Sequence, residues 1–413
     1  MYESKIADVL ILLFICKSKI TIILILLFEK SCTFANKYFL EMKNFSAGKT
    51  VSQGYYKAFI PNMINRDWEI NDMDTLCLLS RADHLLGKMD TYSEYVDIEL
   101  YLEMHIAKEA TQSSRIEGTQ THFEEAFMKK EDIAQERRDD WDELHNYIAA
   151  MNYAVQELKN LPISSRLITQ THNILLQGVR GEHKLPGEFR RSQNWIGGAS
   201  INDARFIPPP HTEISALMSD LEKFANNETN RLPDLLKIAL IHYQFETIHP
   251  FLDGNGRIGR LLITLFLVNK KLLKHPILYL SDFFERHRTL YYDNLTVVRT
   301  QDNINQWFKF FLTGVIEISE KGIATFESIF KLQKTLNERI ATLGVRAADA
   351  NKVLNRLYKN PVIDAAEMGQ ISGKSPKSAY KLISDMEKIG ILNEITGGQR
   401  GRLYVFKEYV ELF

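Results

Sequence analysis

The sequence predicts a mostly α-helical protein built from more than one domain. Apolar residues recur at three- and four-residue spacing through most of the chain after residue 42, which is the pattern of amphipathic helices. The 413 residues exceed what a single compact core usually holds. With 45% hydrophobic and 25% charged residues and only 11 prolines, the composition excludes a disordered or fibrous chain. We therefore expect a helical bundle accompanied by smaller units.

Residues 1–41 contain two apolar runs, Val9 to Cys16 and Ile20 to Phe28, separated by Lys17 and Lys19. A spanning helix needs ~20 predominantly apolar residues, and a lysine at the bilayer centre costs roughly 2.5–3.5 kcal/mol. We interpret this segment as an N-terminal extension that folding does not require, and a misassigned start would give the same appearance. A signal anchor that associates with the membrane is the alternative.

Amphipathic patterns predict a helical region over residues 42–135 and a helical core over residues 136–320. The predicted helices cover residues 68–86, 96–116, 139–158, 166–176, 211–225, 232–247, 257–273, 286–298 and 304–330. Glycines and prolines break the pattern between residues 181 and 211 and leave two short apolar pieces at 194–196 and 205–207. These two pieces predict a small β-hairpin.

The composition shifts again in residues 340–413. Helices are expected over residues 347–357, 363–371 and 375–389, the last of them opened by Ser375 as N-cap and Pro376 at its first position. Two short strands, 391–394 and 403–406, flank a turn at Gly397 and Gly398. This order resembles a winged helix-turn-helix domain.

Such a domain can place the helix after Ser375 in a DNA major groove. Basic residues that would then lie near phosphates are Lys374, Lys377, Lys381, Arg400 and Arg402. The alternative is a protein-contact or dimerisation module, because acidic residues dilute the positive charge. These acidic residues are Asp364, Glu367, Asp385 and Glu387.

The charge of the whole chain and its cysteines exclude several classes of function. Because 51 basic residues nearly balance 52 acidic ones, no global field draws the protein to nucleic acid or to an acidic membrane, and any such affinity is local. Cys16, Cys32 and Cys77 show no Cys-x-x-Cys spacing and no paired histidines nearby, which argues against a zinc site and a disulfide-stapled secreted domain. The sequence therefore favours a cytoplasmic protein.

The residues that carry chemistry are concentrated between His249 and Arg260. Pro250 stops a long helical pattern and a new apolar run begins at Ile258, so this segment is expected to be a loop between two helices. Glycines at the start of a helix leave backbone N–H groups free to cradle a phosphate. Asp253 can hold a magnesium ion, and His249 has a side chain suited to take a proton near neutral pH.

Arg257 and Arg260, three residues apart on the first turn of the second helix, can reach different phosphates. A His-Pro pair alone would be read as a helix end whose histidine satisfies the last carbonyls. The full run of polar residues and glycines after it favours a nucleotide site instead.

This segment matches His-Pro-Phe-x-Asp/Glu-Gly-Asn-Gly-Arg-x-x-Arg at every fixed position, and the chain thereby resembles the Fic domain proteins. The resemblance extends from roughly residue 55 to residue 312. It implies a helical fold and transfer of AMP from ATP to a Tyr, Ser or Thr hydroxyl of a target protein, with release of pyrophosphate. It also implies His249 as the base, Asp253 as the Mg²⁺ ligand and Phe251 as the anchor of the loop in the core. The implied phosphate-binding residues are Gly254, Asn255, Gly256, Arg257, Gly259 and Arg260.

The resemblance assigns roles outside the motif as well. Phe206, Ile207 and Pro208 match the flap, a hairpin that docks the backbone of the target as an added strand. Tyr291 and Tyr292 match a tyrosine pair that flanks the adenine, although aromatic pairs on helices more often belong to a core. Arg299 departs from the family where some relatives carry an asparagine.

Ser113 and Glu117 match the inhibitory motif Ser/Thr-x-x-x-Glu-Gly/Asn, which precedes the catalytic motif in one group of the family. They are one helical turn apart and share a face. The resemblance implies an ion pair between Glu117 and Arg260 that removes the partner of the γ-phosphate. The alternative is an ordinary solvated glutamate before a helix-ending Gly118.

Two hypotheses follow for the whole chain. One is a self-inhibited protein adenylyltransferase that uses ATP and Mg²⁺, modifies a target protein and itself, and can have removal of AMP as a second reaction. The other is a nucleotide-sensing, DNA-binding regulator with little transfer activity. The intact His249 favours the first, because a sensor needs the phosphate cradle but no base. Both hypotheses allow a homo-oligomer.

Overall fold

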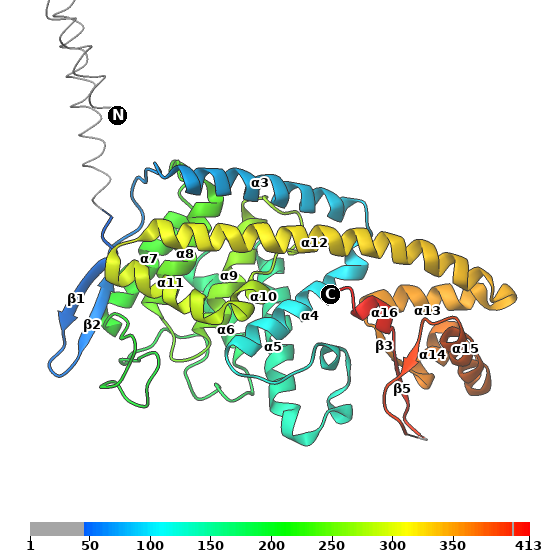
Figure 1. Ribbon diagram of the computed structural model, residues 1–413. Coiled ribbons are helices and arrows are strands. Elements are labelled where there is room, and N and C mark those ends of the chain that lie inside the picture. Colours follow the sequence, from blue (N-terminus) through cyan, green and yellow to red (C-terminus); the bar gives the residue numbers. More distant parts are fainter. Residues whose placement is uncertain (1–44, 399) are drawn as a thin grey trace, which may run out of the picture. The chain divides into compact units, whose positions relative to one another are not determined.

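The computed structural model describes residues 45–398 and 400–413, so the predicted N-terminal extension lies outside the described residues. Within this range the mostly helical fold class is confirmed (Figure 1). The long helices are α3 (Met73–Glu94), α4 (Ile98–Ile116), α5 (Arg138–Glu157), α6 (Ser165–Leu175), α7 (Ile214–Ala225), α8 (Asp234–Ile248), α9 (Asn255–Asn269), α11 (Arg288–Gln301) and α12 (Ile304–Ala341). A short helix that the sequence pattern did not reveal, α10 (Ser281–Arg286), precedes α11.

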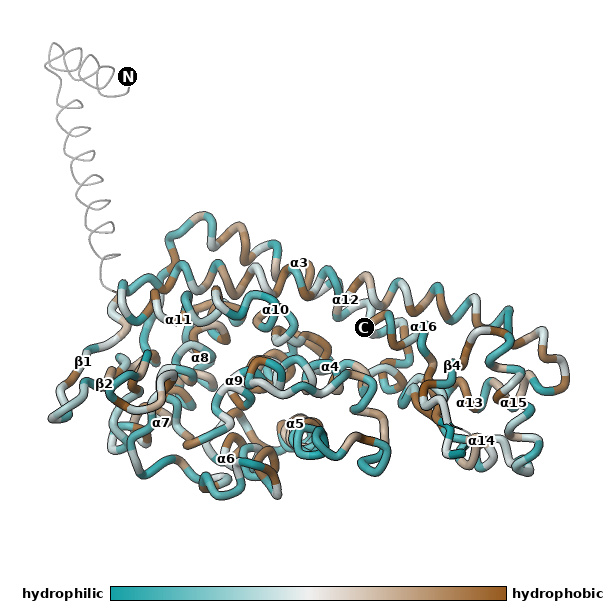
Figure 2. The backbone as a smooth tube through the Cα atoms, turned by 60° about the horizontal axis from the view of Figure 1, so that its bottom comes forward, coloured by the Kyte–Doolittle hydropathy of each residue, from teal (hydrophilic) through white to brown (hydrophobic). Residues whose placement is uncertain are grey.

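Helix α8 lies at the centre of the bundle. Every residue from Leu235 to Ile248 is buried, the polar Lys237, His242, Gln244 and Glu246 included, as befits a mostly apolar helix enclosed by its neighbours. Helix α9 packs on α8, and α3 lies along α12 (Figure 1). In Figure 2, α3 and α12 alternate between hydrophilic and hydrophobic stretches, which fits helices that bury one face only. None of the helices in the described part of the chain has the length and apolarity to cross a membrane.

A β-hairpin precedes the helices and was not predicted. Strand β1 (Gly48–Ser52) pairs with β2 (Lys57–Pro61) in antiparallel register, with Gly48 opposite Pro61 and Ser52 opposite Lys57. Gly54 in the connecting turn has φ 79°, a conformation that glycine adopts without steric cost. The backbone N–H of Phe59 in β2 donates to Ile207 O at 3.0 Å, so the hairpin lies against residues 205–208.

The hairpin predicted within residues 181–211 is reduced to a single antiparallel bridge between Ile196 and Phe206. Gly197 and Gly198 follow Ile196 with φ of 70° and 81° and turn the chain sharply. A Cβ on Gly198 would lie 2.5 Å from Asp203 O, so the turn closes too tightly for any side chain there. Strand pairing therefore ends within one residue of the bridge.

The C-terminal region contains the helices and strands expected for it, with one correction and one short helix, Lys407–Val410, that was not predicted. Its elements are α13 (Ala347–Lys359), β3 (Val362–Asp364), α14 (Ala365–Ser372), α15 (Pro376–Lys388), β4 (Asn393–Glu394), β5 (Leu403–Val405) and α16 (Lys407–Val410). The strands form an antiparallel sheet in the order β3-β5-β4. The helix predicted over 363–371 is wrong at its start, because Val362 and Ile363 pair with β5 and the side chain of Asp364 caps α14 at Glu367 N.

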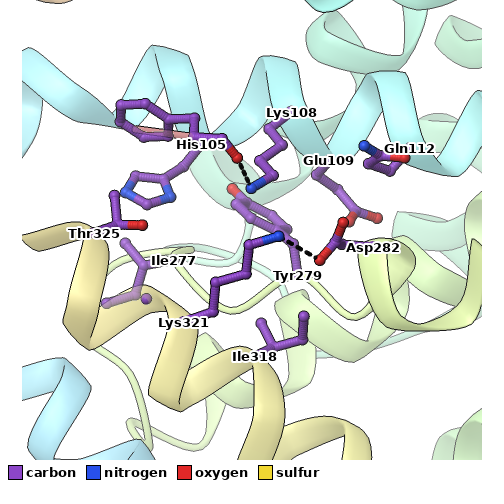
Figure 3. Close-up of a pocket in the computed structure, with 12 residues that line it drawn as sticks. His105, Lys108, Glu109, Gln112, Ile277, Tyr279, Asp282, Ile318, Lys321 and Thr325 are labelled. Carbon is purple, nitrogen blue, oxygen red and sulfur yellow. Dashed lines mark hydrogen bonds and ion pairs between the residues drawn. The ribbon is translucent and has the colours of Figure 1, made fainter. Parts of the chain in front are cut away.

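Helix α4 is held to this C-terminal region. The rings of His105 and Phe413 lie 5.0 Å apart, and Lys108 Nζ donates to Phe413 O. Figure 3 shows His105 and Lys108 at a hollow between α4 and α12, in which Lys321 pairs with Asp282, and Phe413 also lines this hollow. With a volume of about 40 Å³ the hollow is too small for a nucleotide. Its walls connect the C-terminal region to the helix that carries Glu117.

Candidate active site

His249 ends α8 in the left-handed region, with φ 50° and ψ 61°. The following Pro250 disfavours continuation of the right-handed helix, so the chain turns at His249. The turned backbone N–H still donates to Phe245 O at 2.9 Å. A non-glycine residue in this conformation carries strain that the surroundings must offset, which is common at functional sites.

Two side chains that the sequence analysis missed hold this turn. Arg190 is 2% exposed and donates from Nε to His249 O at 2.9 Å and from Nη2 to Pro209 O at 2.6 Å. Asn194 Nδ2 donates to Phe251 O at 2.9 Å. Both residues come from the segment broken by glycines and prolines, where no periodic pattern singles out a buried polar side chain. They fix the base of the flap to the motif loop.

The loop after His249 is organised around Phe251, which is fully buried as expected. Its ring stacks on the imidazole of His172 at 3.7 Å between centroids. His172 accepts from Gly187 N at 2.9 Å and its Nε2 lies 3.0 Å from Asp253 O. Burial lowers the pKa of His172 to about 4, so the imidazole is neutral. Its position on the apolar face of α6 is the signal that could have identified it.

The side chain of Asn255 forms hydrogen bonds with the backbone of the loop. Its Oδ1 accepts from Phe251 N at 2.8 Å and its Nδ2 donates to Phe251 O at 2.9 Å. This pair of bonds closes the loop between the end of α8 and the start of α9. A contact of Asn255 with the α-phosphate stays a prediction, and its loop-closing bonds were not foreseen.

Gly254 opens α9 with φ 72°, and Asn255, Gly256 and Arg257 form the first turn. The first N–H groups of a helix have no partners within the helix and carry its positive dipole end, which suits them to a phosphate. A Cβ on Gly254 would touch the ring of His172 at 3.4 Å. The loop therefore places a phosphate-type cradle directly after the His249 turn.

Arg257 is buried beside acidic groups. Its Nη1 lies 3.3 Å from Glu143 Oε2 and its Nη2 lies 3.6 Å from Asp253 Oδ1. Glu143, a residue of α5, also binds Arg180 at 2.8 Å. The guanidinium is thus held at the start of α9 by a carboxylate that the sequence analysis missed, because α5 lies more than 100 positions away in the sequence.

Arg260 has the geometry that the resemblance implied. Its Nη2 lies 2.7 Å from Glu117 Oε1 and 3.0 Å from Ser113 O, and its Nε donates to Ser113 Oγ at 2.8 Å. Burial opposes the charge of Arg260, but Glu117 outweighs it and raises the pKa of the guanidinium. A Cβ on Gly256 would lie 2.4 Å from Glu117 Oε1, so glycine is required for this approach.

The imidazole of His249 is set up as a neutral base. Burial lowers its pKa to about 4, and the positive charge of Arg190 adds to the shift. Glu117 acts in the opposite direction without cancelling the effect of burial. At neutral pH the ring is therefore unprotonated and able to accept a proton.

Glu246, one turn before His249 on α8, is a buried carboxyl that the sequence analysis did not select. It is 8% exposed, its Oε1 has no hydrogen-bond partner among the described residues, and burial raises its pKa to about 7. A Cβ on Gly259 would lie 2.2 Å from this oxygen, so Gly259 makes room for it. Its position three residues before the His-Pro pair, in a mostly apolar helix, was an available signal.

The two tyrosines lie in different surroundings, Tyr291 in the core and Tyr292 at the surface. Tyr291 is 1% exposed, its hydroxyl lies 2.8 Å from His242 Nε2, and its ring stacks on Phe284 at 4.5 Å. Tyr292 is 39% exposed, and the charges of Glu117 and Arg260 both act on its hydroxyl. The structure therefore offers Tyr292 to a ligand, while Tyr291 fills the core. Contact of either ring with adenine stays a prediction.

The flap residues lie on one side of the motif loop. The ring of Phe206 packs under the guanidinium of Arg299 at 3.8 Å, and Ile207 O accepts from Phe59 N. Pro208 is buried, and its carbonyl accepts from Gln193 at 2.9 Å. Residues 206–208 therefore form a short, well-packed segment, and their role as a flap that docks a target stays a prediction.

The described residues could hold a magnesium ion through a single carboxylate, that of Asp253, together with substrate phosphates. The described residues contain no cluster of three or more histidine, cysteine or acidic side chains that could hold a metal. Asp253, whose side chain is 44% exposed, offers one carboxylate beside the α9 cradle. Mg²⁺ keeps several waters and is commonly held by one or two carboxylates together with substrate phosphates, so this single carboxylate is compatible with it.

Comparison with known proteins gives consistent matches. Residues 162–267 match the Fic/DOC family, and residues 76–156 match the Fic/DOC family N-terminal region. The chain is 34% identical over 167 residues to the protein adenylyltransferase Fic of Aedes aegypti and 35% identical over 130 residues to that of Drosophila grimshawi. These matches cover 40% and 30% of this chain, and only 30% and 25% of the relatives.

A solved structure supports the fold. The crystal structure of a Fic family protein from Desulfovibrio desulfuricans G20 is similar over 83% of this chain and 98% of that one, with a TM-score of 0.53 and 18% identity. At that identity the likeness concerns the fold alone.

Proposed function

This chain belongs to the Fic domain family, and from that premise we propose that it transfers AMP from ATP to a Tyr, Ser or Thr hydroxyl of a target protein. The observation that carries the proposal is the loop between α8 and α9. It combines the neutral imidazole of His249 with a helix start whose first turns hold Arg257 and Arg260. A base and an anion cradle that share one loop are what nucleotidyl transfer to a hydroxyl requires.

In the proposed reaction His249 takes the proton of the target hydroxyl. The hydroxyl oxygen forms a bond to the α-phosphorus, the bond from that phosphorus to the bridging oxygen breaks, and pyrophosphate leaves with the electron pair. The N–H groups at the start of α9 and the two arginines are expected to stabilise the charge on the phosphates. Asp253 would hold Mg²⁺, which neutralises phosphate charge when bound.

We further propose that the ion pair between Glu117 and Arg260 is a brake. The guanidinium of Arg260 makes three hydrogen bonds, two to Ser113 and one to Glu117, both at the C-terminal end of α4. The carboxylate of Glu117 already neutralises this guanidinium and would repel a γ-phosphate brought beside it. The α-phosphate is then not aligned for in-line attack, since alignment depends on contacts to the outer phosphates.

The low pKa of His249 predicts the pH dependence of transfer. A general base acts only when unprotonated, so kcat/KM falls as the pH drops through the pKa of the free enzyme. With a pKa of about 4, kcat/KM for ATP should stay nearly constant from about pH 8 to about pH 6, whereas a histidine of ordinary pKa would lose most of its activity there. The profile is measured with the Glu117→Gly chain at saturating magnesium. A midpoint near 6.5 would contradict this account of His249.

We also propose a second function, DNA binding, for residues 340–413. Three of the four acidic residues expected to dilute the basic surface are engaged elsewhere: Asp364 lies 2.9 Å from Lys129, Glu367 pairs with Arg356, and Asp385 is buried against Arg346. The exposed residues of α15 and of the turn between β4 and β5 are mainly basic or neutral. These basic residues are Lys377, Lys381, Lys388, Arg400 and Arg402, whereas Lys374, just before α15, is itself paired with Asp349 at 3.1 Å. This distribution favours DNA over the protein-contact alternative.

The DNA proposal is tested by fluorescence anisotropy with a labelled duplex over a series of salt concentrations. Reversing two charges on α15, Lys377→Glu with Lys381→Glu, should weaken binding and reduce the salt slope by about 2, since each lost phosphate contact removes about 0.9. The matched control reverses Lys331 and Lys334, two exposed lysines of α12. If the two double variants bind DNA equally well, or if the unmodified chain does not bind DNA at low salt, residues 340–413 are better explained as a protein-contact module.

A further inference from the structure

A second hollow, of about 250 Å³, lies beside the flap. Its walls come from β1 and β2, from residues 204–207 of the flap segment and from α11. No residue of the motif from His249 to Arg260 lines it, so it is separate from the phosphate cradle. The N–H of Phe59 bonded to Ile207 O joins the hairpin and the flap into one wall.

The charged residues of this hollow are all cations. They are Lys57 of β2, Arg205 of the flap segment and Arg299 of α11, and its lining contains no aspartate or glutamate. Among the described residues, none of the three has a carboxylate oxygen within 4 Å, in contrast to Arg257 and Arg260 nearby. Three unpaired cations around one hollow create a site of positive potential that suits an anion.

Arg299 is the fixed member of the three. Its guanidinium stacks at 3.8 Å on the ring of Phe206, and its Nη2 lies 3.5 Å from Thr296 Oγ1. Burial lowers its pKa, which means that its charge is only partly compensated by its surroundings. Tyr243 offsets this effect most, followed by the carboxyl of Glu246, which is itself buried and has a pKa raised to about 7. A partly buried cation with so little compensation is stabilised when an anion binds beside it.

The side chain of Arg205 is also held in place by its packing. A Cβ on Gly197 would lie 2.9 Å from Arg205 Cγ, so the stem of the arginine packs closely against the turn of the flap. The flap segment that lines the hollow is tied to the His249 turn, because Arg190 donates to both Pro209 O and His249 O. An anion in the hollow would therefore lie beside the segment that adjoins the proposed base.

We propose that this hollow is a specificity subsite that binds a carboxylate side chain of the target segment while a nearby hydroxyl of the same segment faces His249. The inference rests on the proposed transfer to a protein hydroxyl. A phosphorylated residue carries the same chemistry as the carboxylate, and a lysine in that place is repelled. The three cations would thus help to choose which hydroxyl is modified.

The test uses the Glu117→Gly chain and a panel of short peptides that contain one tyrosine. Each position within four residues of the tyrosine is occupied in turn by Glu, Gln, Lys or phosphoserine. Binding is measured by fluorescence anisotropy without ATP, and AMP incorporation is measured separately with labelled ATP. Because the binding arm needs no transfer, failure of the subsite is distinguishable from failure of the proposed function.

We expect glutamate at one or two positions to improve affinity and kcat/KM at least tenfold over glutamine, and added salt to reduce the difference. Stronger gains with phosphoserine than with glutamate would identify phosphate as the preferred anion and still support the subsite. Arg205→Glu should reverse the preference toward lysine, whereas Lys331→Glu on α12 should leave it unchanged. Equal affinity for the Glu and Gln peptides, including no measurable affinity for either, would overturn the subsite.

Discussion

Replacement of His249 by alanine is expected to lower AMP transfer by roughly 10²–10⁴-fold while ATP binding persists, because loss of a general base has that typical effect. The phosphate contacts proposed for the α9 N-terminus, Arg257 and Arg260 do not involve the imidazole. The backbone of His249 is fixed through its carbonyl by Arg190, and alanine keeps that carbonyl. Transfer is measured as incorporation of label from ATP, and ATP binding by calorimetry.

The His249→Ala variant needs a check on folding, because residue 249 has φ 50° and alanine adopts this left-handed backbone conformation less readily than histidine does. Circular dichroism and the retained ATP affinity provide that check. His249→Asn serves as a second variant, because an asparagine backbone adopts the left-handed conformation more easily. Undiminished transfer by both variants would exclude His249 as the base.

Replacement of Glu117 by glycine is expected to raise transfer at least about tenfold. A hydrogen bond between charged groups contributes roughly 1.5–3 kcal/mol, and each 1.4 kcal/mol corresponds to about a tenfold change. The Glu117 side chain is 38% exposed, so solvent screening favours the lower end of this range. The charge of Arg260 holds the pKa of Glu117 below its usual range, against the effect of burial, so the pair stays charged at neutral pH.

A double variant distinguishes the proposed inhibition by Glu117 from the proposed contact of Arg260 with the γ-phosphate. Glu117→Gly combined with Arg260→Ala should be inactive, because release of the glutamate cannot replace the guanidinium proposed to hold the γ-phosphate. Glu131→Gly, at an exposed acidic residue outside α4, is the matched control and should behave as wild type. Equal incorporation by wild type and Glu117→Gly would make Glu117 an ordinary helix-ending residue.

The sequence predicted the parts of the site that lie close together along the chain. Pro250 and the glycines after it fixed the end of α8 and the start of α9, because their effects on the backbone are local. The pairing of Glu117 with Arg260 was anticipated from the family motif rather than from spacing, and the 2.7 Å distance confirms the contact. Its inhibitory role stays a prediction.

The parts that could not be predicted depend on contacts between distant segments. Arg190 and His172 reach the motif loop from 59 and 81 positions away, and nothing local to them indicates a buried partner. The β1–β2 hairpin is ordered partly by its bond to Ile207, far along the chain. The bond of the Tyr291 hydroxyl to His242 in the core was likewise not foreseen. Tertiary packing decided each of these positions.

Intact-mass spectrometry of the purified Glu117→Gly chain, after incubation with ATP and magnesium, shows whether this protein transfers AMP. We expect a mass increase of one AMP group, located by fragmentation on a Tyr, Ser or Thr side chain, and no increase when His249→Ala is added to the same chain. An unchanged mass of the Glu117→Gly chain under conditions in which it binds ATP would contradict the proposal that this protein is an adenylyltransferase.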